Sequence, residues 1–256
     1  MADGAVDVRS LKEAVSAEEW QARVNLAALY RLAALEGWDD MIFTHISARV
    51  PGEQTFLINP YGFFFDEITA SSLVKVDLNG DIVGETPHFI NAAGFVIHSA
   101  IHEARTDAHY IVHLHTNQGV AVSAQRDGLL PLTQHAMTCL GQLAYHDYEG
   151  IALNLDEKVR LVRDLGEKKL MLLRNHGTLA IGATAAEAWM GMFMLERACT
   201  QQIMALSAGQ QGVMPAQEEA QAAVTQQMAW GAKAVAQIAW PGLLRKAARR
   251  SPGFDA

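Results

Sequence analysis

The spacing of apolar residues along the chain predicts helices that alternate with short strands. Segments with apolar residues three or four positions apart, as in amphipathic helices, are separated by shorter runs that alternate or are apolar throughout, as strands are. The predicted helices cover residues 17–37, 91–103, 117–124, 156–165 and 184–208, and the predicted strands cover residues 42–50, 55–59, 73–77, 110–115 and 169–174.

Capping and turn residues support these boundaries. Ser16 is placed to cap the first helix, and Gly37 to end it. Thr184 and Glu187 form the capping-box pattern at the start of the long apolar helix. Asn79-Gly80 predicts a hairpin turn that pairs the strand before it with the residues after it.

Interleaved helices and strands predict a layered α/β architecture, with functional residues at strand ends and in loops. The 256 residues, half of them apolar, suffice for one large domain with a substantial core. We expect an N-terminal extension over residues 1–20, the domain over 21–208 and a C-terminal arm over 209–256. Trp230 and Trp240 of this arm need a covering surface, which is either a neighbouring subunit or the arm's own domain.

Charge and cysteine content exclude several classes of protein. The chain has 20 basic and 28 acidic residues, a net charge of −8, and no basic block before its last dozen residues, so we expect no nucleic-acid partner. Its two cysteines lack metal-binding or disulfide-framework spacing, which is typical of a reducing compartment. With no signal-like apolar segment and no apolar run of about 18 residues, we expect a cytoplasmic protein without a membrane partner.

Three histidines at strand ends indicate a metal site. Alternation along a strand puts His113 and His115 on one face, with Leu114 directed into the core. His176 ends the second apolar run, where Gly177 is expected to turn the backbone sharply away. Three neutral imidazoles with one position left open are typical of catalytic sites for zinc, iron or manganese.

Several motifs of the chain resemble those of one known family. They are the His-x-His of residues 113–115, Arg-Asn-His-Gly of 174–177, Ala-Val-Ser-Ala of 121–124, and the segments 56–62, 69–75, 91–95, 98–101 and 145–148. Together they resemble the class II aldolase/adducin family over about residues 22–208, nearest to the adducin-head-like bacterial subgroup. The resemblance implies a three-layer α/β/α fold with a central mixed, mainly antiparallel sheet, a divalent metal, zinc first with manganese or iron as alternatives, and a homotetramer with active sites between subunits.

The chain departs from the sugar-phosphate aldolases of this family at two kinds of position. Their acid/base carboxylate falls at Gly94, which has no side chain to move a proton. The serines that help to hold the substrate phosphate fall at Ala92 and Ala93, and the Gly-Asn-Ile-Ser phosphate loop reads Thr-His-Ile-Ser over residues 44–47. We therefore do not expect the usual phosphosugar reaction.

Other residues are candidates for binding and proton transfer. His135 lies near the position of an active-site tyrosine of the aldolases, and imidazole suits acid/base work near neutral pH. Tyr148 is a second catalytic candidate, as a hydrogen-bond donor to a developing oxyanion. Asn59, at a strand end, is the substrate-binding candidate, whereas His98 is expected to be a core or supporting histidine rather than a fourth ligand.

Three classes of function remain open from the sequence. The hypothesis we favour is a metal-dependent carbon–carbon lyase, a retro-aldolase or decarboxylase that acts through a metal-stabilised enolate on a small, non-phosphorylated, oxygenated substrate. The alternatives are a non-heme iron oxygenase on the same scaffold and a non-catalytic, adducin-like assembly domain. Retention of all three histidines favours an enzyme, and loss of the carboxylate favours the assembly domain.

Overall fold

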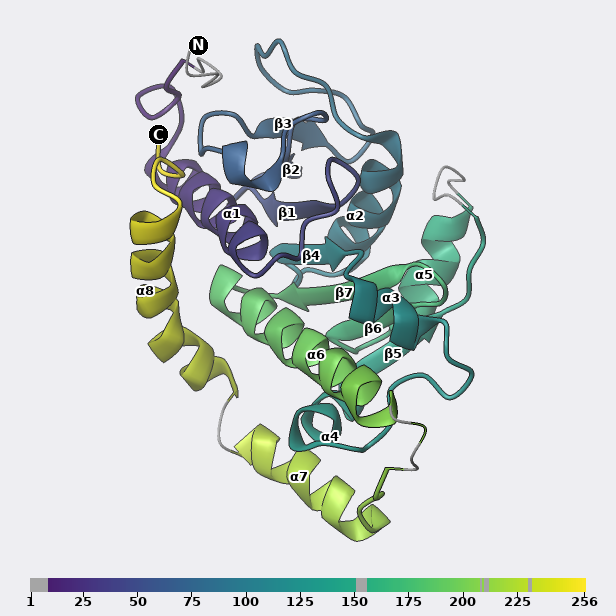
Figure 1. Cartoon of the computed structure of the whole chain (residues 1–256). Coiled ribbons are helices and arrows are strands. Elements are labelled where there is room, and N and C mark those ends of the chain that lie inside the picture. The colour runs from purple at the N-terminus through teal and green to yellow at the C-terminus, as the bar shows by residue number, and fades with distance from the viewer. Residues whose placement is uncertain (1–8, 151–155, 208, 210–211, 230–231) are drawn as a thin grey trace.

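A computed structural model describes residues 9–150, 156–207, 209, 212–229 and 232–256 of the chain, and it confirms the predicted α/β architecture (Figure 1). Seven strands form one sheet in the order β3-β2-β1-β4-β7-β6-β5, in which all neighbours are antiparallel except β5 and β6. The strands are β1 His45–Arg49, β2 Thr55–Ile58, β3 Val74–Asp77, β4 Tyr110–Leu114, β5 Leu143–His146, β6 Leu170–Leu173 and β7 Gly177–Gly182.

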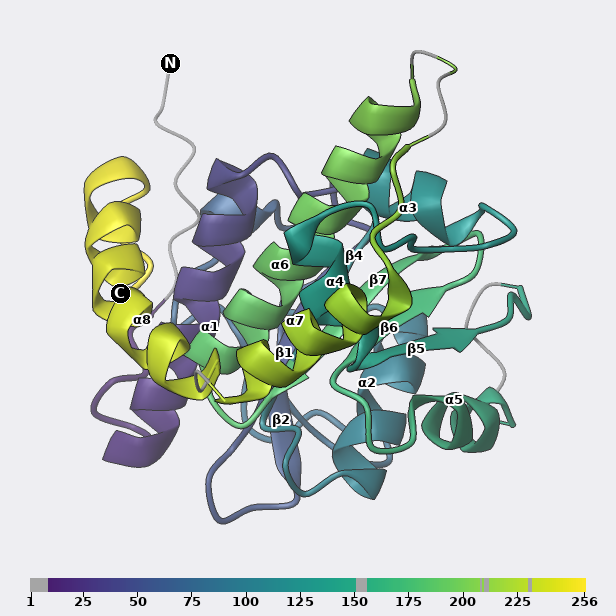
Figure 2. The ribbon, with the colours of Figure 1, turned by 90° about the horizontal axis from the view of Figure 1, so that it is seen from below.

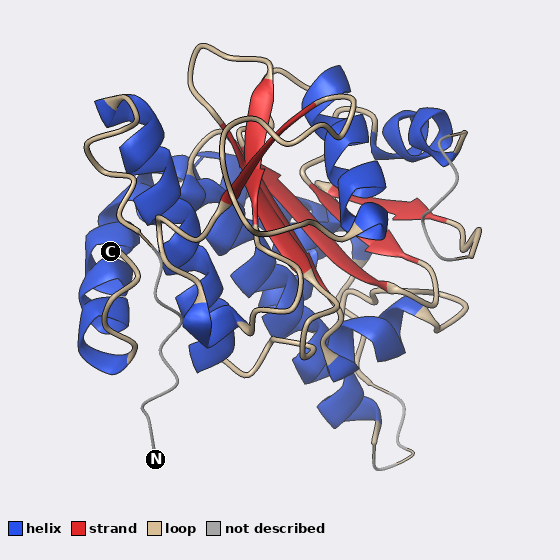
Figure 3. Cartoon of the chain, turned by 90° about the horizontal axis from the view of Figure 1, so that it is seen from above, coloured by secondary structure: helices blue, strands red, loops and turns tan. Residues whose placement is uncertain are grey.

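Helices cover both faces of this sheet, as the view from above shows (Figure 3). The long helices α1 and α6 pack on one face, and α2 and α5 pack on the other. The helices are α1 Ala17–Leu35, α2 Ala92–Ala104, α3 Asn117–Ser123, α4 Gln134–Leu140, α5 Glu157–Leu165, α6 Ala185–Leu206, α7 Gln217–Ala229 and α8 Ala232–Arg250, with a short 3-10 turn at Phe65–Glu67.

The predicted caps and turn are present. The Ser16 side chain accepts a hydrogen bond from the backbone N–H of Glu19 at the start of α1. Thr184 caps α6 in the same way by accepting from the Glu187 N–H. An antiparallel bridge between Val76 and Ile82 closes the turn at Asn79-Gly80. None of the described helices is long and apolar enough to cross a membrane.

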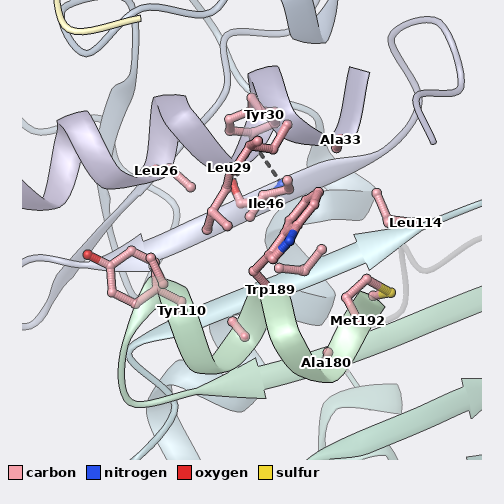
Figure 4. Packing of buried hydrophobic residues seen from close by; sticks show 14 of the residues in the cluster. Leu26, Leu29, Tyr30, Ala33, Ile46, Tyr110, Leu114, Ala180, Trp189 and Met192 are labelled. Carbon is pink, nitrogen blue, oxygen red and sulfur yellow. Dashed lines mark hydrogen bonds between the residues drawn. The ribbon is translucent and has the colours of Figure 1, made fainter. Parts of the chain in front are cut away.

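Alternation along the central strands sends side chains to two different cores. Val112 and Leu114 of β4 join the core beneath α1 and α6, whereas Ile111 joins the core beneath α2 and α5. Tyr30 of α1 is fully buried in the larger core, where its hydroxyl accepts a hydrogen bond from the backbone N–H of Ile46 (Figure 4). These two tightly packed layers fix β4, the strand that leads to the histidine pair.

The described part of the C-terminal arm packs on its own domain. Helix α8 lies beside α1 in two perpendicular views (Figures 1 and 2) and also packs against α6. Trp240 is partly buried against the larger core, and the Lys246 ammonium pairs with Glu36 of α1. The chain end is held by hydrogen bonds from the backbone of residues 70 and 71 to that of residues 254 and 256. Trp230 lies outside the described residues, and contact of the arm with a neighbouring subunit stays a prediction.

The turn after the second apolar run differs from the one that the sequence predicted. The chain does not turn away at Gly177; instead it forms a β6–β7 hairpin, and Asn175 is the residue with a left-handed backbone, with φ of 57°. Asparagine tolerates this conformation better than most residues. Gly177 is needed for space, because a Cβ there would lie 2.4 Å from the backbone oxygen of Leu114.

Replacing Gly177 with alanine is therefore expected to destabilise the protein. The new methyl group meets backbone rather than a movable side chain, so β4 and β7 must separate, at a cost of about 1–3 kcal/mol. Chemical denaturation measures this change in the free energy of unfolding. Gly242→Ala in α8, where a Cβ would have no neighbour closer than 3.7 Å, is the control and is expected to be neutral or slightly stabilising. Equal stabilities of the two variants would contradict this account of Gly177.

Candidate metal centre

The end of one strand and one hairpin turn bring three histidines together. His113 is the fourth residue of β4 and is fully buried, and His115 follows the end of that strand on the same side. His176 lies in the turn between β6 and β7. The centroid of the His176 ring lies 4.8 Å from that of the His113 ring and 4.8 Å from that of the His115 ring. One ligand nitrogen from each ring lies within 4.8 Å of the other two, so the predicted triad converges on one point.

Hydrogen bonds on the far side of two rings determine which nitrogens face this point. His113 Nδ1 lies 3.0 Å from the carbonyl oxygen of Thr178, which can only accept, so this nitrogen carries a proton. His115 Nδ1 is 3.1 Å from Asp40 Oδ2 and donates to that carboxylate. In the neutral rings both Nε2 atoms therefore carry lone pairs, and they lie 3.1 Å apart. Two lone pairs at that distance repel each other unless a cation lies between them.

Burial favours the neutral, ligating form of two members of the triad, His113 and His176. It lowers the pKa of His113 well below the usual range, and the neighbouring imidazoles of His176 and His115 lower it further. Burial, with the His115 ring, also lowers the pKa of His176 to about 4. The donor set thus fits zinc, iron or manganese, which bind neutral imidazole.

A buried carboxylate ties the segments that carry the triad to α6. Glu196 is 2% exposed and accepts hydrogen bonds from the hydroxyls of Thr116 and Thr178, both at 2.5 Å. Thr116 follows His115, and Thr178 is the residue whose carbonyl orients His113. Burial raises the pKa of Glu196 to about 7, against the effect of the two hydroxyls.

Strand β1 and helix α2 contribute one buried histidine each next to the triad. His45 stands opposite His113 in the antiparallel pairing of β1 and β4, and their ring centroids are 5.2 Å apart. His45 Nδ1 lies 2.9 Å from Nε2 of His98 on α2. His98 is fully buried and, as expected, is not part of the triad.

The other predicted site residues do not contact the triad within the described chain. His135 is half-buried on α4, with its Nδ1 3.3 Å from the Gln201 side chain of α6. Tyr148 is 55% exposed after β5. Asn59 follows β2, is 5% exposed, and accepts a hydrogen bond from Tyr30 at 2.8 Å. Their roles stay predictions.

Three supporting residues were not found from the sequence. Asp40 lies in a loop, 75 positions from His115, and Glu196 lies in an apolar helix, 80 positions from Thr116, so pattern alone does not connect them to the triad. Glu196 is the single carboxylate in the apolar run of residues 188–196, and a charged residue in such a run was a usable signal of a specific role. His45 was noted only as a departure from the aldolase phosphate loop.

Fold and triad together define an α/β protein with three converging histidines that could hold a metal ion, and comparison with known proteins names its family. Residues 24–203 match the model of the Class II Aldolase and Adducin N-terminal domain. The chain belongs to this family. The match confirms the predicted family and its α/β fold.

Three similar proteins illustrate the range of the family. A Caulobacter vibrioides protein whose name assigns it to aldolase class 2 is 67% identical over 255 residues, 99% of both chains. Rat alpha-adducin is 50% identical over 189 residues, which are 72% of this chain and 26% of the adducin. The structure of L-fuculose 1-phosphate aldolase from Glaciozyma antarctica matches with a TM-score of 0.78 and 28% identity, over 92% of this chain and 93% of that one. These likenesses support an aldolase-type lyase.

Proposed function

We propose that the protein is a metal-dependent carbon–carbon lyase, a retro-aldolase or a decarboxylase, acting on a small oxygenated substrate without a phosphate group. The observation that carries the proposal is the pair of Nε2 atoms of His113 and His115, 3.1 Å apart, with His176 beside them and with both Nδ1 atoms turned toward acceptors. Zinc is the proposed cation, and manganese and iron are alternatives for the same ligands.

We assign cation binding, orientation of the ligand rings and substrate binding to different residues of the chain. His113, His115 and His176 would hold the cation, and Thr178 and Asp40 keep the first two rings in the ligating tautomer. A cation held there would supply Lewis-acid stabilisation of the negative charge of an enolate. Asn59 Oδ1 is engaged by Tyr30, so its Nδ2 group is the part we assign to the substrate.

Proton transfer is assigned to His135, with Tyr148 as a hydrogen-bond donor to the developing oxyanion. His135 lies on α4, which packs against α6 and α7, and its ring makes no contact with its own triad among the described residues. We therefore propose a homotetramer in which these side chains reach the site of a neighbouring subunit. Light scattering of the purified protein tests the number of subunits.

The start of α2 favours a substrate without a phosphate. Helix N-termini bind phosphate through free backbone N–H groups. Here Asn91 caps α2, and its side chain accepts from the N–H of Ala93 at 3.0 Å. Ala92 and Ala93 also bring no hydroxyl group to this end of the helix.

The test is exchange of carbon-bound hydrogen, the signature of an enolate. The zinc-loaded protein is incubated in D₂O with dihydroxyacetone, with dihydroxyacetone phosphate and with a panel of small hydroxy and oxo acids, and NMR follows deuterium uptake and loss of carboxyl groups. We expect turnover of at least one non-phosphorylated compound, lost with a chelator. Turnover of the phosphate ester alone would contradict the proposed substrate class. No turnover of any compound would contradict the lyase and favour the assembly domain.

A further inference from the structure

A line of buried polar side chains runs from the triad beneath α2. It consists of His45, His98, Ser47 and His102, called here the histidine string, and all four are at most 3% exposed. His98 Nδ1 lies 2.5 Å from Ser47 Oγ, and Ser47 Oγ lies 2.8 Å from His102 Nε2. The string ends at the backbone oxygen of Ala108, 3.0 Å from His102 Nδ1.

This ending fixes the direction of every hydrogen bond in the string. A carbonyl only accepts, so His102 Nδ1 donates, and in the neutral ring its Nε2 accepts the single Ser47 proton. Ser47 must then accept from His98 Nδ1, which leaves His98 Nε2 to accept from His45 Nδ1. His45 Nε2 is left without a proton, and no described residue donates to it.

We propose that the histidine string presents the His45 Nε2 lone pair beside the metal centre, where it binds an O–H group of the molecule seated there. This assignment of a substrate-binding residue rests on the proposed function. The matching ligand carries a hydroxyl next to the oxygen that faces the cation, as a 2-hydroxy acid or a hydroxyketone does. The string is a positioning device, because its closed end at Ala108 gives a proton no exit.

Gly94 makes room for this arrangement. A Cβ at position 94 would lie 2.5 Å from Cδ2 and 2.8 Å from Nε2 of His45, closer than real Cβ contacts. The His45 ring is therefore held between Gly94 and His113. The position at which the sugar-phosphate aldolases carry their carboxylate is thus the position that admits an imidazole from β1 in this chain.

The surroundings keep the string neutral, as its hydrogen-bond directions require. Burial lowers the pKa of His45 and of His98 well below the usual range, and it lowers that of His102 to about 3. The rings of His98, His115 and His176 lower the pKa of His45 further.

The first experiment reads the tautomers directly in the metal-free protein. Histidine-selective ¹⁵N labelling and long-range ¹H–¹⁵N correlation at pH 7.5 are expected to show His45, His98 and His102 protonated at Nδ1 alone. The signals of these three residues are assigned with His45→Gln, His98→Gln and His102→Gln.

Ser47→Ala interrupts the string and is expected to give mixed tautomers at His98 and His45. Ser99→Ala is the control, because Ser99 is buried on α2 next to His98 but donates its hydroxyl proton to the Val96 carbonyl instead of joining the string. A proton on His45 Nε2, or unchanged tautomers in Ser47→Ala, would overturn the proposal.

The second experiment measures ligand preference in the zinc-loaded protein. Calorimetry compares glycolate with methoxyacetate, which lacks the hydroxyl proton, for the wild type and His45→Phe. One hydrogen bond predicts a preference for glycolate that is about tenfold smaller in His45→Phe than in the wild type. The same preference in both proteins, each holding zinc, would overturn the role of His45. A wild type that holds no zinc would overturn the proposed function instead, and the tautomer experiment would still decide on the string.

Discussion

Replacing His113 with alanine is expected to abolish stoichiometric binding of divalent metal, and His176→Ala is expected to do the same. Each variant leaves two imidazoles of a site whose ligand nitrogens all lie within 4.8 Å of one another. Loss of a supporting residue alone lowers metal affinity by about 10- to 100-fold, so loss of a ligand is expected to lower zinc affinity by more than about 100-fold. Isothermal titration calorimetry of the chelator-treated proteins with zinc measures the stoichiometry and the affinity.

His135→Ala is the matched control for this prediction. His135 is a histidine of similar exposure to His115 and His176 but bonds to Gln201 on α6. Its removal is expected to leave zinc stoichiometry and affinity unchanged while lowering turnover. If His135→Ala also loses the metal, the assignment of His135 to proton transfer is wrong. Full zinc affinity in His113→Ala would refute the triad itself.

Replacing Glu196 with glutamine is expected to stabilise the metal-free protein above pH 7. Burial raises the pKa of Glu196 to about 7 in the folded state, whereas the unfolded chain releases this proton near the ordinary value of 4.5. The folded state therefore holds the proton over that interval, and the wild type loses stability as the pH rises from about 4.5 to 7. Glutamine has no proton to lose, so the variant is expected to be more stable by up to about 3 kcal/mol at pH 8.

The amide also fits the hydrogen bonds at this position. Its oxygen can accept from Thr116 and its NH₂ group can donate to Thr178, whose own proton can turn to the Leu114 carbonyl, 3.4 Å away. Chemical denaturation of both proteins from pH 5 to pH 8 in the presence of a chelator measures the difference. The difference should grow with pH and level off above pH 7. A variant that is less stable than the wild type at pH 8 would contradict the raised pKa.

Most of the fold followed from local patterns that the structure confirms. The helix of residues 17–35 begins after Ser16 as its cap and period predict, and the hairpin at Asn79-Gly80 closes where its turn chemistry places it. Period-two alternation also placed Leu114 in the core and both strand histidines on the other side. These features depend on neighbours within a few residues, which is the range that sequence patterns report.

The features that sequence did not predict depend on contacts between distant segments. Residues 177–182 form strand β7, which the sequence did not reveal because Gly177 was interpreted as a turn residue. Its actual role is to leave space for the backbone oxygen of Leu114 on β4. The partnership of Gly94 with His45 likewise joins α2 to β1, 49 positions away. The sequence showed that a carboxylate is missing at position 94, but only the packed structure shows which side chain occupies the space.

The central claim is that the three histidines form a metal centre, and the metal content of the purified protein tests it most directly. Mass spectrometry for zinc, manganese and iron, done before and after reloading of the chelator-treated protein, is expected to find one divalent ion per chain, with zinc first. Iron accompanied by oxygen consumption would move the assignment to the oxygenase. No bound metal, and none taken up on addition of zinc, would contradict the account.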